Sequence, residues 1–295
     1  MELNSLAAFV AVAEAGGFSR AAARLISTQP TLSRQVKALE QELGRPLFDR
    51  LGRRVELTAF GRESLDRARS ILSQAQALQI SGRASPGQVS GLLRLGLADS
   101  VALEHFPPIL LRFRRRHPGV RVHVRTAGSP DILNWVRDGA CDAGLCMLPR
   151  IHPELELIEL WQDRFVCLVP PDHALAERAA KLSDFATERQ IAIQAGTLSH
   201  QVLTAAFLAE GLPYVPDMTF DNFHLIVDLV TTGVGVGIAS RDVAEEALRR
   251  KRIARVHIDR IDGLRRSIGL VRHAERAVEG ALAAFCEEVD RATAG

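Results

Sequence analysis

The residues with the clearest chemical pattern lie between positions 29 and 43. At about 100° per residue, a helix there gathers polar and cationic side chains on one side: Pro30, Ser33, Arg34, Lys37 and Gln41. The opposite side carries four apolar residues: Leu32, Val36, Leu39 and Leu43. Short polar side chains at the start of such a helix can reach base edges in a major groove, while cations contact phosphates. The same pattern fits an amphipathic helix on an ordinary protein surface, so this helix alone leaves both interpretations open.

Two shorter helices are predicted before it. The first should end at Gly16 and Gly17. Its apolar face comprises Leu6, Phe9, Val10 and Ala13. Ser19 is expected to cap a second, alanine-rich helix, RAAARLI. The third helix should run from about Gln29 to Leu43, because a proline is tolerated in a first turn and Gly44 can end a helix.

A short basic hairpin follows the third helix. Two strands are predicted, at 47–50 and 55–57, around a tip that contains Arg53 and Arg54. Three short helices and such a hairpin make a winged helix-turn-helix. An arginine at the tip of the wing can enter a narrow minor groove, where the negative potential is strongest.

A longer helix is predicted from Ala59 to about Ile80, with Thr58 as its cap. Its apolar stripe follows 3-4 spacing: Leu65, Ala68, Leu72 and Ala75, widened by Ile71 and Leu78. Small residues alternating with leucine suit a two-helix seam, so we interpret this as a dimerisation helix. The alternative is a helix that packs on its own domain. The stretch SGRASPGQ (81–88) is rich in Gly, Ser and Pro, which indicates a hinge and a domain boundary.

From residue 89 onward, predicted strands and helices alternate. Strands are expected at 92–98, 120–126, 143–146, 165–169, 191–193 and 214–220. Helices are expected at 101–116, 129–138, 199–210, 223–232 and 242–250. Repeated βα units favour a largely parallel, doubly wound α/β architecture, for which about 200 residues would suffice to build two lobes. The glycine-rich GVGVGIAS (233–240) follows a helix, so it predicts a tight turn into a strand instead of a dinucleotide site.

Hydroxyl side chains stand where strands end and helices begin in this α/β part. They are Ser100, Ser129, Thr197 and Ser199. Ligands of open α/β sheets bind beyond the carboxyl ends of the strands, and free N–H groups at helix starts attract anions. Each residue alone could be a simple N-cap, but their recurrence in both lobes favours an anion-binding cleft. Since no basic residue is expected in the cleft, a neutral aromatic ligand stays an alternative to a small carboxylate.

Composition and motifs argue against several other classes. The formal charge is +2 for 295 residues, but residues 1–90 carry +4 and the remainder −2, which favours a polyanion as partner of the first part. The sequence lacks HExxH, GxSxG and P-loop patterns, and its four cysteines form no CxxC pair. We therefore expect no enzyme activity, no catalytic residue, no metal and no cofactor. Because apolar runs of ~20 residues and a secretory signal are also absent, we expect a cytoplasmic chain with no membrane association.

Residues 3–61 resemble the winged-helix domain of LysR-type transcriptional regulators, and SRQVKALEQELGRPLFDR is the most specific stretch of the similarity. Weaker marks follow in FPPILLRFRRRHPGV, PPDHALA and GVGVGIAS, so the resemblance covers nearly the whole chain. It implies a two-lobed effector domain like periplasmic solute-binding proteins. It also implies a homo-oligomer, usually a tetramer, that binds an interrupted palindrome in double-stranded DNA and bends it in response to a small effector.

The resemblance assigns roles to individual positions. The major groove would face Gln29, Pro30, Thr31, Ser33 and Arg34, and the minor groove would face Arg53. Lys37 is assigned to a phosphate, from the helical wheel more than from the family. The effector contacts would be Ser100, Val101, Ser129, Cys146, Thr197, Ser199 and Asn222. The implied domains are 1–58 (winged helix-turn-helix), 59–88 (linker helix and hinge) and 89–295 (effector domain, with lobe I at 89–162 and 266–295 and lobe II at 163–265).

Two other interpretations stay open. One is a solute-binding or enzymatic α/β module whose N-terminal helices only dimerise. The other is a redox sensor that uses Cys141 and Cys146. Peroxide-sensing members of the family carry a reactive cysteine pair in lobe II, whereas no cysteine lies between 168 and 285 here. RNA polymerase is a further candidate partner of a regulator, and the sequence identifies no particular effector.

Overall fold

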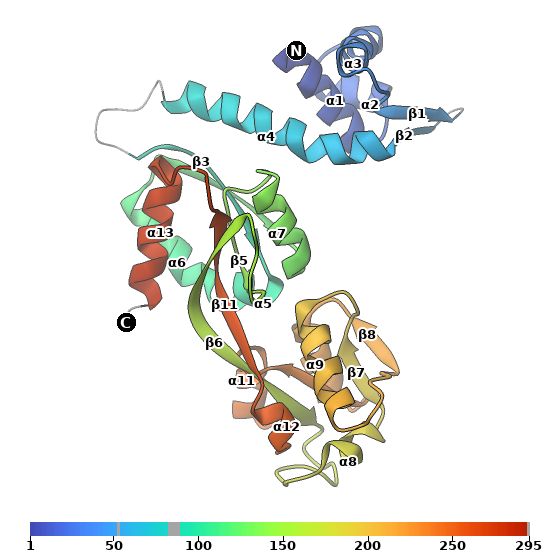
Figure 1. Ribbon diagram of the computed structural model, residues 1–295, viewed down its shortest axis with the longest axis vertical. Coiled ribbons are helices and arrows are strands. Elements are labelled where there is room, and N and C mark those ends of the chain that lie inside the picture. Colours follow the sequence, from blue (N-terminus) through green and yellow to red (C-terminus); the bar gives the residue numbers. More distant parts are fainter. Residues whose placement is uncertain (52–53, 82–88, 294–295) are drawn as a thin grey trace.

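A computed structural model describes residues 1–51, 54–81 and 89–293. Figure 1 shows a helical N-terminal part with a small hairpin, followed by two α/β lobes. Two long strands, β6 (Leu155–Val169) and β11 (Arg265–His273), run between the lobes. The last helix, α13 (Gly280–Thr293), packs on the lobe that follows the N-terminal part.

Three helices and a hairpin form the N-terminal part, in the predicted order. They are α1 (Leu3–Ala15), α2 (Phe18–Arg24), α3 (Gln29–Leu43), β1 (Phe48–Leu51) and β2 (Arg54–Leu57). α3 has the predicted bounds, with Thr28 as its N-cap and Gly44, at a φ of 68°, as its C-cap. Within the described ranges no single helix is long and apolar enough to cross a membrane; α1 and α2 reach that length and composition only as a pair, bent by 113°.

α2 begins two residues earlier than expected. Its N-cap is Gly17, and no side-chain cap hydrogen bond is found among the described residues, so the prediction of Ser19 as the N-cap is wrong. The Phe18 ring packs edge-on against Phe48, with ring centroids 5.8 Å apart, which holds residue 18 in the first turn. Residues 52 and 53 lie outside the described ranges, so the structure does not test the assignment of Arg53 to the minor groove.

α4 (Ala59–Ser81) is the predicted long helix, and the Thr58 hydroxyl caps it by accepting a 2.8 Å hydrogen bond from the Gly61 N–H. Part of its apolar stripe packs within its own chain. Leu65, Ala68 and Leu72 join the core of the first three helices, and Ala68 is 3% exposed. For these residues the helix packs on its own domain, because the short alanine lets α1 approach closely. Ile71 stays exposed.

The described strands of the lobes form one mixed sheet. Besides β6 and β11, they are β3 (Gly91–Leu97), β4 (Val120–Thr126), β5 (Ala143–Met147), β7 (Gln190–Ile193), β8 (Met218–Phe220), β9 (Val236–Ser240) and β10 (Ala254–Val256). β3 pairs in parallel with β4 and β5, and β7 with β8 and β9, which confirms the doubly wound pattern in each lobe. β6, β10 and β11 pair antiparallel with their neighbours. β10, β11 and the first two-thirds of β6, residues 155–164, are missing from the predicted strands.

Helices connect the strands of both lobes. They are α5 (Asp99–Glu104), α6 (Phe106–Arg116), α7 (Ser129–Arg137), α8 (Leu182–Ala186), α9 (Leu198–Ala209), α10 (Phe223–Thr231), α11 (Arg241–Arg249) and α12 (Asp259–Asp262), in addition to α13. α5 and α6 replace the single helix expected at 101–116. The break falls at His105 because Pro107 and Pro108 have no backbone N–H with which to continue the hydrogen bonds of α5.

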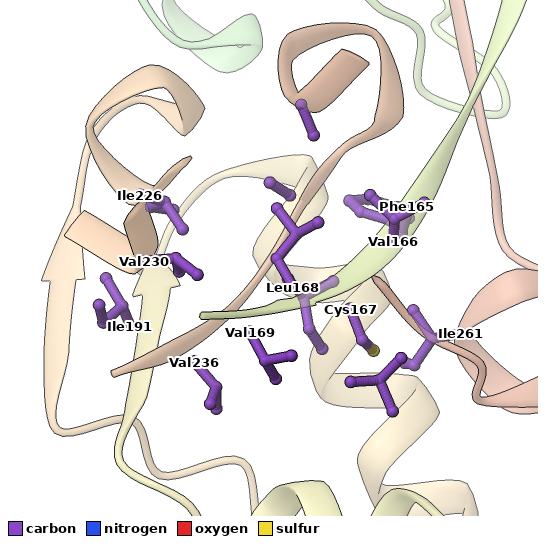
Figure 2. Close-up of a cluster of buried hydrophobic side chains, with 14 of the residues drawn as sticks. Phe165, Val166, Cys167, Leu168, Val169, Ile191, Ile226, Val230, Val236 and Ile261 are labelled. Atoms are coloured by element: carbon purple, nitrogen blue, oxygen red, sulfur yellow. The ribbon is translucent and has the colours of Figure 1, made fainter. Parts of the chain in front are cut away.

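Each lobe has its own hydrophobic core. Phe113 and Phe285 belong to the core of the first, which we call lobe I. The core of the second, lobe II, surrounds the last part of β6. Figure 2 shows Phe165 and Leu168 of β6 in this core together with Ile226 of α10. β6 therefore leads from one core into the other, and β11 leads back.

A buried ion pair joins β6 to β11 where the lobes meet. Asp163 and Arg266 are directly opposite in the strand register, and Arg266 Nη1 lies 2.8 Å from Asp163 Oδ2. Asp163 also accepts hydrogen bonds from the Ser240 hydroxyl, at 2.6 Å, and from the backbone N–H of Arg164. Both charged side chains are almost fully buried, so each depends on the other for interactions that replace water.

We predict that Arg266→Met lowers the free energy of unfolding by about 3 kcal/mol, because it leaves the buried Asp163 without a countercharge. The double variant Asp163→Asn, Arg266→Met removes both charges and should recover part of the loss. Urea-induced unfolding of the full chain measures each effect. Arg265→Met, at the exposed neighbouring position of β11, is the matched control and should change the free energy by about 0.5 kcal/mol or less. Equal losses in the two single variants would contradict this role.

Candidate functional site

α3 turns its polar side away from the helical core, as its amphipathic pattern predicts. The buried residues of this helix are Leu32, Val36 and Leu39. Among the residues assigned to DNA, Gln29, Pro30, Arg34 and Lys37 are exposed, and Thr31 and Ser33 are half-buried. The assigned contacts of α3 therefore share one accessible side of the helix.

Hydrogen bonds at the start of α3 hold some of these side chains in place. The Thr31 hydroxyl lies 2.8 Å from the Thr28 hydroxyl, so it takes part in the helix cap. Arg34 Nε donates a hydrogen bond to the Pro30 carbonyl oxygen at 3.4 Å, which keeps the guanidinium along the exposed side. Amide and hydroxyl groups thus lie at the first turn and cations one and two turns later, an arrangement suited to base edges and phosphates.

Glu40 joins α3 to the hairpin and is absent from the predicted site residues. Its Oε1 accepts hydrogen bonds from the backbone N–H groups of Leu47 and Phe48, at 2.8 and 3.2 Å. These donors lie at the start of β1, so the carboxylate fixes the wing relative to the helix. The sequence carries no local signal for this contact, because a glutamate late in an amphipathic helix usually faces solvent.

A small cleft with a cavity of about 60 Å³ lies between the lobes. Five of the residues assigned to an effector line it: Ser100, Ser129, Thr197, Ser199 and Asn222. Val101 and Cys146 do not, because their side chains are buried in the core of lobe I, at 1% and 0% exposure. Their chain neighbours Ser100 and Met147 face the cleft instead. The expectation that Val101 and Cys146 line the cleft is therefore wrong.

Four helices begin at the cleft: α5, α7, α9 and α10. Thr197 and Asn222 cap two of them, by accepting hydrogen bonds from the N–H groups of His200, at 3.1 Å, and Leu225, at 2.9 Å. These two side chains therefore act as N-caps. The helix dipoles and the remaining N–H groups of the first turns favour negative charge in the cleft.

Arg266 also lines the cleft, so the expectation of a cleft without a basic residue is wrong. It is 3% exposed, and its guanidinium carbon lies 4.9 Å from the centre of the Phe223 ring. Burial lowers the pKa of Arg266, and the neighbouring Asp163 opposes that shift. Its Nε has no hydrogen-bond partner among the described residues. No sequence pattern points to this residue, because the strand that carries it, β11, is absent from the predicted strands.

Two histidine–carboxylate contacts join the lobes beside the cleft. His105 Nε2 lies 3.2 Å from Asp242 Oδ2, and His224 Nε2 lies 3.1 Å from Glu104 Oε1. They hold the end of α5, in lobe I, against α10 and α11, in lobe II. All four side chains are partly exposed.

The two cysteines of the redox interpretation, Cys141 and Cys146, are buried. Burial raises the pKa of the Cys146 thiol to about 12, and a hydrogen bond with Ser129 opposes the shift only in part. The thiolate is the reactive form of cysteine, so Cys146 is poorly suited to sensing an oxidant. Over the described residues, no group of three or more His, Cys, Asp or Glu side chains is placed to hold a metal ion.

Known proteins match both parts of the chain. Residues 3–62 match the bacterial regulatory helix-turn-helix proteins of the lysR family, and residues 86–294 match the LysR substrate binding domain. The HTH-type transcriptional regulator ShiR of Corynebacterium glutamicum is 34% identical over 243 residues, which are 81% of this chain and 82% of ShiR. The Hca operon transcriptional activator HcaR of Escherichia coli is 32% identical over 242 residues, 81% of this chain and 80% of HcaR.

Solved structures show the same architecture. The crystal structure of CbnR, a LysR family transcriptional regulator, superimposes with a TM-score of 0.75 at 26% identity and covers 99% of both chains. CbnR in complex with its target DNA gives a TM-score of 0.73, over 99% of this chain and 100% of CbnR. Sequence, fold and the order of the two parts agree, and the chain belongs to the LysR family of bacterial helix-turn-helix regulatory proteins.

Proposed function

We propose that this chain is a transcriptional regulator that binds duplex DNA through α3 and the wing, and that a small effector in the interlobe cleft changes how it binds and bends that DNA. The exposed side of α3 carries the proposal, because its amide, hydroxyl and cationic groups point away from the protein core. The major groove, about 12 Å wide, admits such a helix. CbnR, a relative of the same architecture, binds its target DNA as a full-length protein.

The proposed DNA contacts are of three kinds: to the major groove, to a phosphate and to the minor groove. Gln29, Pro30, Thr31, Ser33 and Arg34 would face the major groove, where Arg34 would make a charge contact. Lys37 would neutralise a phosphate, and Arg53 would enter the minor groove. Thr31 is held by the helix cap, which supports a contact made through its methyl group or backbone.

We propose the domain division 1–58, 59–88 and 89–295, with lobe I at 89–162 and 266–295 and lobe II at 163–265. Separate hydrophobic cores in the N-terminal part and in each lobe support it. The pairing of β6 also passes from β11 to β9 between Arg164 and Phe165. This change of partner lies close to the proposed lobe boundary.

We further propose that the chain acts in the cytoplasm as a homo-tetramer, a dimer of dimers, on an interrupted palindrome. Two-fold pairs of recognition helices read half-sites about 34 Å apart. Ile71 on α4 supports helix pairing between copies, because it stays exposed. Leu65, Ala68 and Leu72 of the same stripe pack in the core of their own chain. RNA polymerase would be the partner of the DNA-bound form.

For the effector we propose a small monocarboxylate. Four helix starts and the unpartnered Nε of Arg266 favour one negative group. Asp99 and Asp221 line the same cleft, so a second negative group would be repelled. A cavity of about 60 Å³ is far smaller than the roughly 300–1,000 Å³ of drug-sized sites. A neutral aromatic ring would require the lobes to open, which makes it the weaker candidate.

We predict that Arg34→Ala weakens binding to all duplexes by about tenfold, since it removes a charge contact, whereas Gln29→Ala changes the preferred base at one position. Duplexes selected from a random pool by the wild-type protein provide the probe. Fluorescence anisotropy at several salt concentrations gives the affinity and its salt slope, which should become shallower by about one unit in Arg34→Ala.

Arg150→Ala is the matched control for that measurement, because Arg150 is an exposed arginine far along the chain in lobe I. It should bind as the wild type does. If Arg34→Ala kept the wild-type affinity and salt slope, the orientation assigned to α3 would be wrong. Salt-insensitive binding by the wild type would instead favour a solute-binding module whose N-terminal helices only dimerise.

We predict that small monocarboxylates raise the Tm of the full chain in a thermal-shift screen. A ligand at about one hundred times its Kd adds about 2.7 kcal/mol to the stability of the folded state. Ser100→Trp should abolish the shift, because it fills the cleft. Ser183→Trp adds the same bulk at an exposed site in lobe II and should leave the shift intact. An equal shift in wild type and Ser100→Trp would place the ligand elsewhere.

A further inference from the structure

Ile26, in the turn between α2 and α3, combines two unfavourable features. Its side chain is 98% exposed, and its backbone lies in the left-handed region at a φ of 49°. β-branched residues rarely adopt this conformation, because their side chains crowd the backbone there. The other non-glycine residues with positive φ among those described, Glu177 and Lys251, are not β-branched.

The turn itself has a geometry that normally favours glycine. The Ser27 N–H donates a hydrogen bond to the Ala22 carbonyl oxygen at 3.0 Å, closing the end of α2. This is the long hydrogen bond of a Schellman motif, and Ile26 occupies its left-handed position, where glycine is preferred. Glycine would relieve the strain and remove the exposed apolar surface. Folding of the chain alone therefore gives no reason for an isoleucine here.

The surroundings of Ile26 indicate what could compensate these costs. Ile26 precedes Thr28, the N-cap of α3, by two residues, and exposed Gln29 and Pro30 follow directly. The side chain therefore lies at the end of α3 that the proposed function places in the major groove. Strained residues that persist in a fold cluster at ligand-binding sites, and the continuous surface here is the DNA-binding one.

We propose that Ile26 makes an apolar contact with the bound duplex, an inference that rests on the proposed function. DNA offers two apolar groups at this place. One is the thymine methyl group, the apolar feature of base edges in the major groove. The other is the carbon skeleton of deoxyribose along the rim of the groove. Both would remove the exposed side chain from water without adding a charge contact.

The test is Ile26→Gly in the full chain, measured on duplexes that the wild-type protein selects from a random pool. We expect a higher Tm, because the strain is relieved, together with an affinity about tenfold lower, because the buried apolar contact is lost. The salt slope should equal that of the wild type, since no charge is removed. Ile26→Leu keeps an apolar side chain and should bind close to the wild-type affinity.

Ile151→Gly is the matched control, because Ile151 is also an isoleucine, 87% exposed, and lies in lobe I away from α3. It should leave the affinity unchanged. Replacing each thymine of the selected duplex by uracil removes the methyl group alone. If one replacement lowers the affinity of the wild type and leaves the affinity of Ile26→Gly unchanged, the contact is with that methyl group. If no replacement does so while Ile26→Gly binds more weakly than the wild type, the contact is with deoxyribose.

Unchanged affinity of Ile26→Gly, in an assay where Arg34→Ala is weakened, would overturn the inference and leave the proposed function standing. A wild-type chain that binds no duplex in a salt-dependent manner would overturn both.

Discussion

The buried pair of Asp163 and Arg266 is the interaction on which the two-lobed part depends. β6 and β11 carry the chain between the lobes, and the pair joins them at the crossing. Taking charges out of water costs several kcal/mol per ion, and only close geometry with further hydrogen bonds offsets that cost. The Ser240 hydroxyl and a backbone N–H supply those bonds to Asp163. Polar contacts therefore hold β6 and β11 together where they pass between the lobes, while an apolar core stabilises each lobe.

The same pair connects the crossing with the cleft. Because Asp163 balances the charge of Arg266, the preference of the cleft for a negative group rests on helix starts and on one unpartnered Nε. Beside the cleft, the lobes are held by the partly exposed contacts of His105 and His224, and contacts of that exposure are worth roughly 1 kcal/mol or less each. A ligand that binds one arrangement of the lobes better by a few kcal/mol is therefore strong enough to shift their equilibrium.

Most features defined by neighbouring residues could be predicted, with the N-cap of α2 as an exception, whereas contacts between particular distant residues could not. Thr28 and Gly44 mark the two ends of α3, through a hydroxyl cap and a left-handed glycine. Both signals lie within a few residues of the helix end that they define. β11 is missing from the predicted strands because its key contact joins residues 103 positions apart, and polar residues at both ends of the strand leave only a short apolar run between them. The misplaced contact at Cys146 has a different cause. Successive side chains of a strand face opposite sides, so an uncertainty of one position exchanges Met147, which faces the cleft, for a residue in the core.

Packing in the N-terminal part limits how an effector can influence DNA binding. α1 contacts both α3 and α4, and Ala68 of α4 is buried against it. Glu40 in turn ties the wing to α3. Since close-packed cores do not deform gradually, we expect the three helices, the wing and the first half of α4 to move as one body. Under the proposed function, a change in the lobes would act by reorienting such bodies within an oligomer, so an effector should alter the bend of the DNA while the base preference proposed for Gln29 stays the same.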